Sequence, residues 1–295
     1  LGRVPRVTVT YVVDNSMKVG YGADVNWFQQ YGYLYDGLGK RLISFDIGVF
    51  KMHGFGLLTY NNMIRFRLGF ELGFDNISQN ISVIDIDNLG NFSGIIFTDF
   101  SINTYDQLYF PKKGMQFNAI VDVGTGRNQN IKILDEDNLE YYYQDFNNYS
   151  FGLDIEGVIP LSNHFALQPK LYYRKTVGEE LPITKTSFIG GFQQSYIENY
   201  LPFAGYDFME LSGHTVIYPA IDLRYSFWEK HYLTASASLL SLDLNFDKSW
   251  DDNLFYYAYQ LTYSYNSPFG PISLSMAKAY PKEKFVFDLS LGFWF

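Results

Sequence analysis

The last eleven residues of the chain, 285–295, read FVFDLSLGFWF, and this stretch decides the fold class. Every second residue from Phe285 to Phe295 is large and apolar, whereas the residues between them include Asp288 and Gly292. Because successive side chains of a strand point to opposite faces, one face of this strand is apolar throughout and the other is mixed. A soluble sheet would cover the apolar face with a core, whereas a membrane barrel turns it toward lipid and keeps the mixed face in a wet interior.

Residues 63–75 show the same alternation most clearly. The apolar positions are Ile64, Phe66, Leu68, Phe70, Leu72 and Phe74, and the positions between them are Arg65, Arg67, Gly69, Glu71, Gly73 and Asp75. A helix would spread these charges around its whole circumference and leave no face to bury, so the pattern predicts a strand. It also predicts that Phe66 and Phe70 face lipid, where arginine would block assembly, and that Gly69 faces inward, where serine would be tolerated.

Composition narrows the function classes. The chain has 295 residues, of which 47% are hydrophobic, yet no run approaches the 18 apolar residues of a transmembrane helix. It has no cysteine, which excludes disulfides and thiolate metal sites, and its net charge of −9 argues against nucleic acid as a partner. Because it begins Leu1-Gly2-Arg3, without an initiator methionine or a signal peptide, we expect a processed protein or a piece of a longer one.

Alternation over the whole chain predicts an all-β fold, a transmembrane antiparallel β-barrel of fourteen strands in a single domain, 1–295. The expected strands are 6–13, 18–28, 41–51, 55–61, 63–75, 94–104, 115–123, 149–160, 164–176, 216–228, 231–245, 254–266, 270–280 and 285–295. The count becomes sixteen if 29–35 or part of 177–214 forms a further hairpin. Fourteen strands, each apolar across a whole face, are too many for a soluble β-sandwich, so the pattern argues against a soluble binding module of that fold.

Short and long connectors alternate, as they do in outer-membrane barrels. The expected short periplasmic turns are 29–40, 61–63, 105–114, 161–163, 229–230 and 267–269. The expected extracellular loops are 76–91, 124–147, 177–214, 246–253 and 281–284. Loop 177–214 is too long to be a simple connector, so we expect it to have a function of its own.

Charged residues on the mixed faces predict the chemistry of the barrel interior. The residues that alternation directs inward are Asp24, Asp46, Arg65, Arg67, Glu71, Asp99, Asp122, Asp154, Glu156, Lys170, Arg174, Asp222, Arg224 and Asp288. Charges are costly in lipid, by about 2–4 kcal/mol for an arginine or lysine at the midplane. We expect these groups to form ion-pair networks that hold loop 177–214, with its Gly190-Gly191 pair, as a plug. The alternative is a selective open pore.

Several short motifs point to a family. They are Tyr109-Phe110-Pro111-Lys112-Lys113-Gly114, Phe188-Ile189-Gly190-Gly191, Leu201-Pro202-Phe203-Ala204-Gly205-Tyr206, Asp222-Leu223-Arg224, Lys230-His231-Tyr232-Leu233 and Ser267-Pro268-Phe269-Gly270-Pro271. With these motifs the sequence resembles the Omp85 superfamily of barrel-assembly and two-partner-secretion proteins. It looks most like the C-terminal barrel of Bacteroidetes patatin-like proteins of the type V secretion kind. One feature differs: the sixth loop of the superfamily carries an Arg-Gly-Phe/Tyr tip, whereas 177–214 contains no arginine.

The resemblance implies a Gram-negative outer-membrane barrel that anchors an N-terminal patatin-like domain, absent from this chain, and serves it as an export or lipid-access conduit. A stand-alone porin or transport barrel is the alternative. The implied partners are membrane lipid and lipopolysaccharide, the fused domain and the barrel-assembly machinery, and a homodimer stays open. The assembly signal implied at the C-terminus consists of Phe287, Leu289, Leu291, Phe293 and Phe295.

Catalysis is not expected of the barrel itself. No Gly-x-Ser-x-Gly nucleophile turn occurs, and the four histidines, His53, His164, His214 and His231, are scattered along the sequence. His214, near Asp207 and Glu210, is the strongest candidate for a catalytic base. The simpler interpretation is that these three are surface loop residues without a catalytic role. We therefore predict no catalytic residues, no metal site and no cofactor in this chain.

Overall fold

A computed structural model of the chain describes residues 6–13, 19–35, 41–81, 89–135, 138–192, 199–243, 254–282 and 284–292. The chain divides into two compact units, each described by itself. Unit 1 comprises Leu1–Phe100, Ile120–Phe151 and Thr176–Thr186, and unit 2 comprises Ser101–Ala119, Gly152–Lys175 and Ser187–Phe295. No helix in the described ranges is long and apolar enough to span a membrane.

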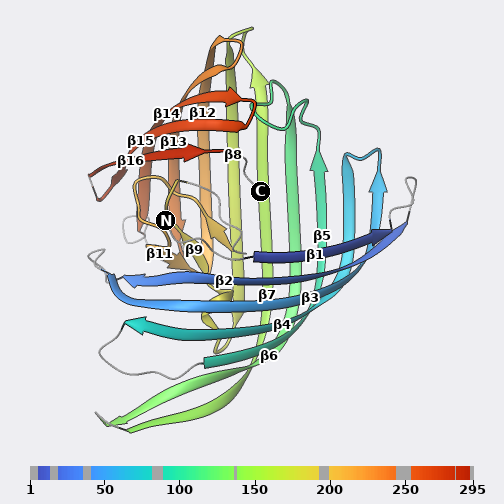
Figure 1. Cartoon of the computed structure of the whole chain (residues 1–295), viewed down its shortest axis with the longest axis vertical. Coiled ribbons are helices and arrows are strands. Elements are labelled where there is room, and N and C mark those ends of the chain that lie inside the picture. Colours follow the sequence, from blue (N-terminus) through green and yellow to red (C-terminus); the bar gives the residue numbers. More distant parts are fainter. Residues whose placement is uncertain are drawn as a thin grey trace. The chain divides into compact units, whose positions relative to one another are not determined.

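Among the described residues, thirteen strands are hydrogen-bonded in one sheet in the order β1 to β8, then β12 to β16 (Figure 1). They are β1 (Arg6–Val13), β2 (Gly20–Tyr35), β3 (Arg41–Tyr60), β4 (Ile64–Ile81), β5 (Leu89–Asn103), β6 (Gly114–Asp135), β7 (Asn138–Pro160), β8 (Phe165–Gly178), β12 (Thr215–Trp228), β13 (His231–Leu242), β14 (Phe255–Ser267), β15 (Gly270–Tyr280) and β16 (Phe285–Leu291). Within 177–214 lie a 3-10 turn, η1 (Ile183–Lys185), and a small separate sheet of β9 (Ser187–Ile189), β10 (Tyr200–Leu201) and β11 (Leu211–Gly213).

Strand register sorts the side chains of each unit onto two faces. In unit 1 His53 lies opposite Glu71, and the neighbouring pair is Gly54 with Phe70, which points to the other side. In unit 2 Asp222 lies opposite Ser236, and Leu223 lies on the other side. We call the side of His53 or Asp222 the polar face and the side of Phe70 or Leu223 the apolar face.

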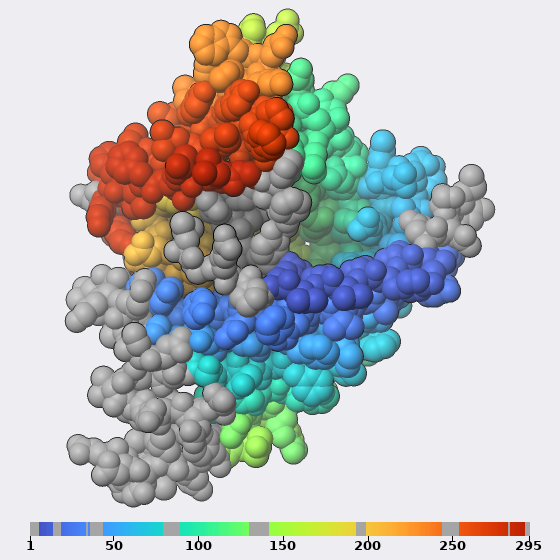
Figure 2. Space-filling model, in the orientation of Figure 1, coloured from blue at the N-terminus to red at the C-terminus, as the bar shows by residue number. Residues whose placement is uncertain are grey.

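The apolar face consists of exposed large side chains in both units. Phe70 is 55% exposed in unit 1, and Leu274 is 54% exposed in unit 2. Figure 2 shows the residues of β1 and β2 (blue) as a continuous band of surface in unit 1. On β16, Phe287, Leu289 and Leu291 are also exposed, whereas Phe293 and Phe295 lie outside the described residues. The alternation predicted from the sequence is therefore confirmed for these strands.

The main sheet has thirteen described strands in place of the predicted fourteen, because 41–51 and 55–61 belong to one strand, β3. With the three short strands within 177–214, the described strands number sixteen, which is the alternative count. His53-Gly54 is not a turn: both residues stay paired to β2 and to β4. The strand ends joined by 36–40 therefore lie at the same end of the unit 1 strands as the end of β4 that precedes 82–88. The prediction that 29–40 and 76–91 lie on opposite sides is wrong as well.

The predicted loop 124–147 is mostly strand, since β6 extends to Asp135 and β7 begins at Asn138. Cross-strand contacts hold these extensions together, among them Arg127 Nε to Asp145 Oδ1 at 2.8 Å. Both residues are exposed. Backbone pairing continues there without the apolar alternation, which is why the sequence pattern missed it.

The polar face of unit 1 also carries an apolar cluster that alternation assigned to lipid. Phe45, Ile47 and Val49 are at most 5% exposed and pack with Phe28, with Ile183 against them. Since odd-numbered residues of β3 share the face of His53, Asp46 lies on the opposite face and its predicted inward direction is wrong. The local pattern could not show that a residue of 177–214 covers this part of the sheet.

Gly69 does face the polar side, opposite Phe55, but its predicted tolerance of serine is wrong. A Cβ atom there would lie 2.5 Å from the Gly54 carbonyl oxygen and 2.8 Å from Phe97. Both contacts are closer than real Cβ atoms show, and one is to backbone. Serine at this position would therefore force the sheet or the Phe97 ring to move.

Candidate functional site

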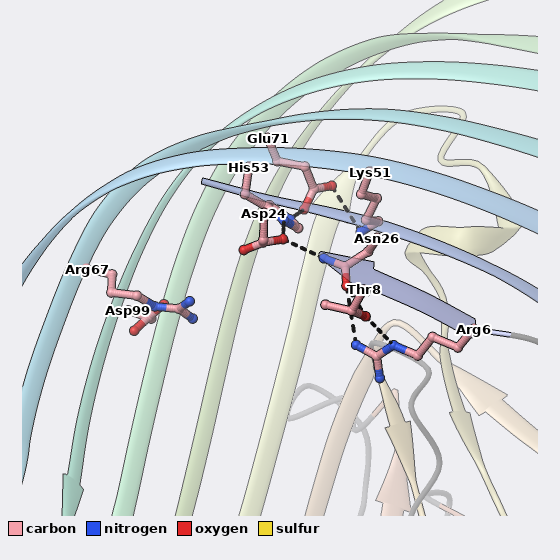
Figure 3. A network of polar contacts seen from close by, with 9 residues as sticks. All are labelled: Arg6, Thr8, Asp24, Asn26, Lys51, His53, Arg67, Glu71 and Asp99. Atoms are coloured by element: carbon pink, nitrogen blue, oxygen red, sulfur yellow. Dashed lines mark hydrogen bonds and ion pairs between the residues drawn. The ribbon is translucent and has the colours of Figure 1, made fainter. Parts of the chain in front are cut away.

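The polar face of unit 1 is organised around His53, which lies between two carboxylates from the neighbouring strands (Figure 3). Its Nδ1 lies 2.6 Å from Asp24 Oδ1 on β2, and its Nε2 lies 2.7 Å from Glu71 Oε2 on β4. Glu71 Oε1 also lies 3.0 Å from Lys51 Nζ. Ionised carboxylates only accept hydrogen bonds, so a doubly protonated imidazolium satisfies both contacts.

A chain of side-chain hydrogen bonds extends this cluster to the edge of the sheet (Figure 3). Asn26 donates to Asp24 at 2.5 Å, Thr8 donates to Asn26 at 2.7 Å, and Arg6 Nε donates to Thr8 Oγ1 at 3.0 Å. The bonds connect β1, β2, β3 and β4 on one face. Each pair of neighbouring strands from β1 to β4 is thus tied by polar contacts as well as by the backbone ladder.

Arg67 forms a second cluster on the same face, with Asp99 as its partner. Its Nε lies 2.7 Å and its Nη2 2.6 Å from Asp99 Oδ2. The guanidinium lies over the rings of Phe55, at 5.3 Å, and Phe97, at 5.9 Å. Of the predicted inward residues of β4, Arg67 and Glu71 are therefore in separate clusters, and Arg65 is exposed beside the 61–63 turn.

In unit 2 the predicted inward charges pair between neighbouring strands. Arg174 on β8 binds Asp154 on β7 through both Nη atoms, at 2.5 and 2.9 Å. Lys170 on β8 lies 2.9 Å from Asp222 on β12. Asp222 thus has its cation on the neighbouring strand of the sheet.

Two of the sequence motifs meet in unit 2. Arg224 of Asp222-Leu223-Arg224 donates through Nη2 to the carbonyl oxygen of Pro111, in the turn 109–114. The Phe110 ring stacks on Tyr232 with centroids 4.1 Å apart and planes 10° apart, and Arg224 lies over the same Tyr232 ring at 5.7 Å. The turn predicted as a simple periplasmic connector is therefore fastened to the polar face of β12 and β13.

The segment 187–213 packs its apolar side chains on the polar face of unit 2. Ile189 and Phe203 are fully buried with Val216 of β12 and Leu240 of β13. The remaining members of this cluster are Leu201, Tyr206, Ala258 and Ala279. We call 187–213 the inner loop. Its apolar side chains therefore pack on the same face that carries the charges of unit 2.

Gly190 and Gly191 shape the inner loop, with φ of 140° and 73°. A Cβ on Gly190 would collide with the carbonyl oxygen of Asp207, and one on Gly191 would lie 2.8 Å from the Tyr200 hydroxyl oxygen. The Tyr200 hydroxyl donates to the Gly190 carbonyl oxygen. Burial raises the pKa of Tyr200 and that of Tyr206 above the usual range of a phenol, so both remain neutral donors.

The candidate base His214 is not joined to the acids proposed beside it. Glu210 pairs with Lys282 at 2.6 Å and accepts from the backbone N–H of Asp207 at 2.6 Å. The backbone N–H of His214 donates to Asp243 at 3.0 Å. Across the described ranges, no three His, Asp or Glu residues are arranged to hold a metal ion.

The expected strands 41–51 and 55–61 leave His53 between them, so alternation did not indicate its central role. The signal was present: Lys51, His53 and Phe55 continue the two-residue period of β3 through that point. Alternation also placed Lys170 and Asp222 on the same face, but it did not predict that they form a pair. Their pairing depends on the register of β8 against β12, which alternation leaves free.

Comparisons with known proteins agree with this architecture. Residues 60–295 match the OMP85 superfamily. The structure of BamA from Haemophilus ducreyi lacking POTRA domains 1-3 is similar, with a TM-score of 0.69 and 14% identity over 98% of this chain and 62% of that chain. CdiB from Escherichia coli is similar with a TM-score of 0.55 and 12% identity, over 97% of this chain and 51% of that one.

The chain thus spans less than two thirds of either structure, and at these identities the likeness shows the fold. No curated protein sequence matches the chain. Barrels of the superfamily are non-catalytic transport and assembly proteins of the Gram-negative outer membrane. The match over four fifths of the sequence shows that the chain belongs to the OMP85 superfamily and has its outer-membrane β-barrel fold.

Proposed function

We propose that the chain is a plugged barrel that anchors a patatin-like domain, not present in this chain, and provides it with an export or lipid-access conduit. The observation that carries the proposal is the inner loop, which covers part of the polar face of β12 to β15. The patatin association is supported by the motifs 201–206 and 230–233 that the sequence shares with such proteins.

Seating of the inner loop is favoured by apolar burial. Ile189, Phe203, Val216 and Leu240 are all 0% exposed, and full burial of a side chain of this kind contributes about 1.5–3 kcal/mol. Lys282 adds an ion pair to Glu210 at 2.6 Å, and its ammonium lies 5.4 Å from the centre of the Tyr206 ring. A loop held in this way would open rarely by itself, and a partner or substrate that displaces it would open it more often.

Conductance in planar bilayers tests the plug. The intact chain should pass little current, and deletion of 181–212 should open a large, steady channel. The Gly190→Val variant should give frequent transient openings, because its Cβ cannot be accommodated beside Asp207. A large, steady conductance from the intact chain would reject the plug and favour an open pore.

A stand-alone transport barrel is the second candidate, favoured by a cavity of about 460 Å³ beside the inner loop in unit 2. Neither candidate places catalytic residues in this chain. If a patatin-like domain supplies the lipase, the chain folded in detergent should show no phospholipase or esterase turnover. Turnover that the His214→Ala variant abolishes would instead make the barrel itself the enzyme.

We also propose that β16 carries the signal read by the assembly machinery. Phe287, Leu289 and Leu291 form an exposed apolar row along β16, the last strand in the order of the main sheet. Replacing Leu289 by Asp should reduce the folded, heat-modifiable fraction in outer membranes, whereas Ser290→Asn on the other face should not. Equal folded yields would argue against the signal.

A further inference from the structure

The cavity in unit 2 has a chemical character that the proposed conduit role does not use. Its volume is about 460 Å³, within the range of small-molecule sites. Strands β8 and β12 to β15 line it, and Phe110 and Phe192 border it from two loops. All of its lining residues belong to unit 2.

One wall of the cavity is neutral and rich in hydroxyl and amide groups. Register places Ser236 opposite Gln260 and Thr234 opposite Thr262, all on the polar face. Gln260 Nε2 donates to Thr262 Oγ1 at 2.9 Å, so the amide is oriented along the wall. These side chains are short, which leaves the space open, and their groups both donate and accept hydrogen bonds.

The adjoining strands β7, β8 and β12 carry charges that already compensate one another, and β12 pairs directly with β13 of the neutral wall. Lys170 pairs with Asp222 at 2.9 Å, and the Tyr172 hydroxyl donates to Glu156 at 2.5 Å. Arg224 donates to the carbonyl oxygen of Pro111. The lining thus holds two cations and two carboxylates, all engaged. An ionic ligand would have to break one of these contacts, which is costly for buried groups, whereas a neutral ligand would not.

Aromatic rings complete the lining. Tyr172 and Tyr218 form a tilted pair with centroids 5.2 Å apart, and Phe110 and Phe192 line the cavity as well. The C–H faces of a pyranose are apolar and suit such rings, and its hydroxyl groups suit a wall of serine, threonine and glutamine. We propose that this cavity binds a neutral saccharide of about two sugar units.

Saturation-transfer NMR on the 295-residue chain, folded in a detergent without a sugar head group, tests the class of ligand. The probes are N,N′-diacetylchitobiose, which is neutral, and chitobiose, which has the same skeleton with two ammonium groups. The neutral sugar should give saturation transfer and the dication little or none. Absence of a signal from the neutral sugar, or equal signals from both, would overturn the proposal.

Two variants test the location. Gln260→Met removes the amide at similar volume, and Leu261→Met, on the apolar face where Leu261 is 43% exposed, is its matched control. Loss of the amide contacts should weaken diacetylchitobiose binding about tenfold, and the control should bind like the parent chain. Heat-modifiable migration would verify that both fold. Unchanged binding by folded Gln260→Met would overturn the assignment.

A last comparison separates free sugar from the head group of a glycolipid. Maltose and dodecyl maltoside carry the same neutral disaccharide, and only the second has an alkyl chain. Comparable affinities are expected if the cavity takes a free saccharide. A signal from dodecyl maltoside alone, lost in Gln260→Met, would assign the same site to a lipid-borne sugar, and silence from both would overturn the proposal.

Discussion

The polar faces of the two units are stabilised in different ways. In unit 1, His53, Glu71 and Lys51 form a charged cluster in which every contact runs between neighbouring strands. In unit 2, strand charges such as Lys170 and Asp222 also pair, but the inner loop adds a fully apolar cluster that includes Ile189 and Phe203. The polar face of unit 1 therefore combines its charged cluster with the apolar cluster of Phe28, Phe45, Ile47 and Val49. The polar face of unit 2 combines ion pairs between strands with the apolar cluster under the inner loop.

The difference shows how the inner loop is held on the polar face although 177–214 contains no arginine. A loop that holds to the wall by an ion pair needs that cation, whereas the inner loop is buried through aliphatic and aromatic side chains. Asp222 then takes its cation from Lys170 on β8. The inner loop should consequently respond to changes in packing and little to salt, since apolar contacts are not screened.

The largest effect is expected from breaking charge compensation in unit 1. Glu71→Ala leaves Lys51 and His53 without their shared carboxylate, and loss of one partner of a buried pair costs about 3–5 kcal/mol. Denaturant unfolding followed by tryptophan fluorescence would measure the loss of unfolding free energy. Arg65→Ala, at an exposed position, should change it by less than about 0.5 kcal/mol.

Replacing the whole cluster would sharpen this result. A chain with Asp24→Asn, Lys51→Met, His53→Leu and Glu71→Leu removes all four charges at similar volume, so it should recover much of the stability lost in Glu71→Ala. If Glu71→Ala is as stable as the parent chain, unit 1 does not depend on charge compensation.

An intermediate effect is expected on the apolar face, where the two units should behave alike. Phe70→Arg in unit 1 and Leu274→Arg in unit 2 replace residues that are 55% and 54% exposed. Each arginine should cost about 2–4 kcal/mol if its position lies near mid-membrane. Folding yield into lipid vesicles, read by heat-modifiable migration, would measure it, with Phe70→Leu as the tolerated control. Normal yields from both arginine variants would contradict the face assignment.

The smallest effect is expected from trimming the inner loop. Ile189→Val removes one methylene from a fully buried position and should cost about 0.5–1.5 kcal/mol. This cost should be the same at low and high salt, whereas an ionic attachment would weaken with salt. Thermal melts of the loop, followed by near-UV circular dichroism of its tyrosines, would report it. A cost that changes strongly with salt would contradict apolar seating.

The sequence predicted the strands where each strand has one apolar face, as in 63–75 and the last five strands. It failed where tertiary contacts decide. Phe45, Ile47 and Val49 looked like a lipid face but lie on the polar face, because Ile183 from a distant segment covers them. The sequence of 124–147 has no sustained two-residue alternation of apolar residues, so the strand extensions left no periodic signal.

The candidate sites were predictable to a similar extent. Alternation placed Arg67, Glu71, Arg174, Asp222 and Arg224 on the polar face, but not their partners. The contact of Arg224 with Pro111 joins residues 113 positions apart, and no local pattern specifies it. The glycines 190 and 191 were recognisable as a special backbone site, whereas the residues that require them, Asp207 and Tyr200, follow only from the fold.

Thiol labelling of the inner loop tests the central claim most directly, because the chain has no cysteine of its own. Ser187 is 1% exposed, and Ser212, on the neighbouring strand of the same small sheet, is exposed. A water-soluble maleimide should label Ser212→Cys quickly and Ser187→Cys only as fast as the loop opens. Adding Gly190→Val to Ser187→Cys should remove the protection. Equal labelling rates at Ser187→Cys and Ser212→Cys in the folded barrel would contradict a loop seated on the polar face.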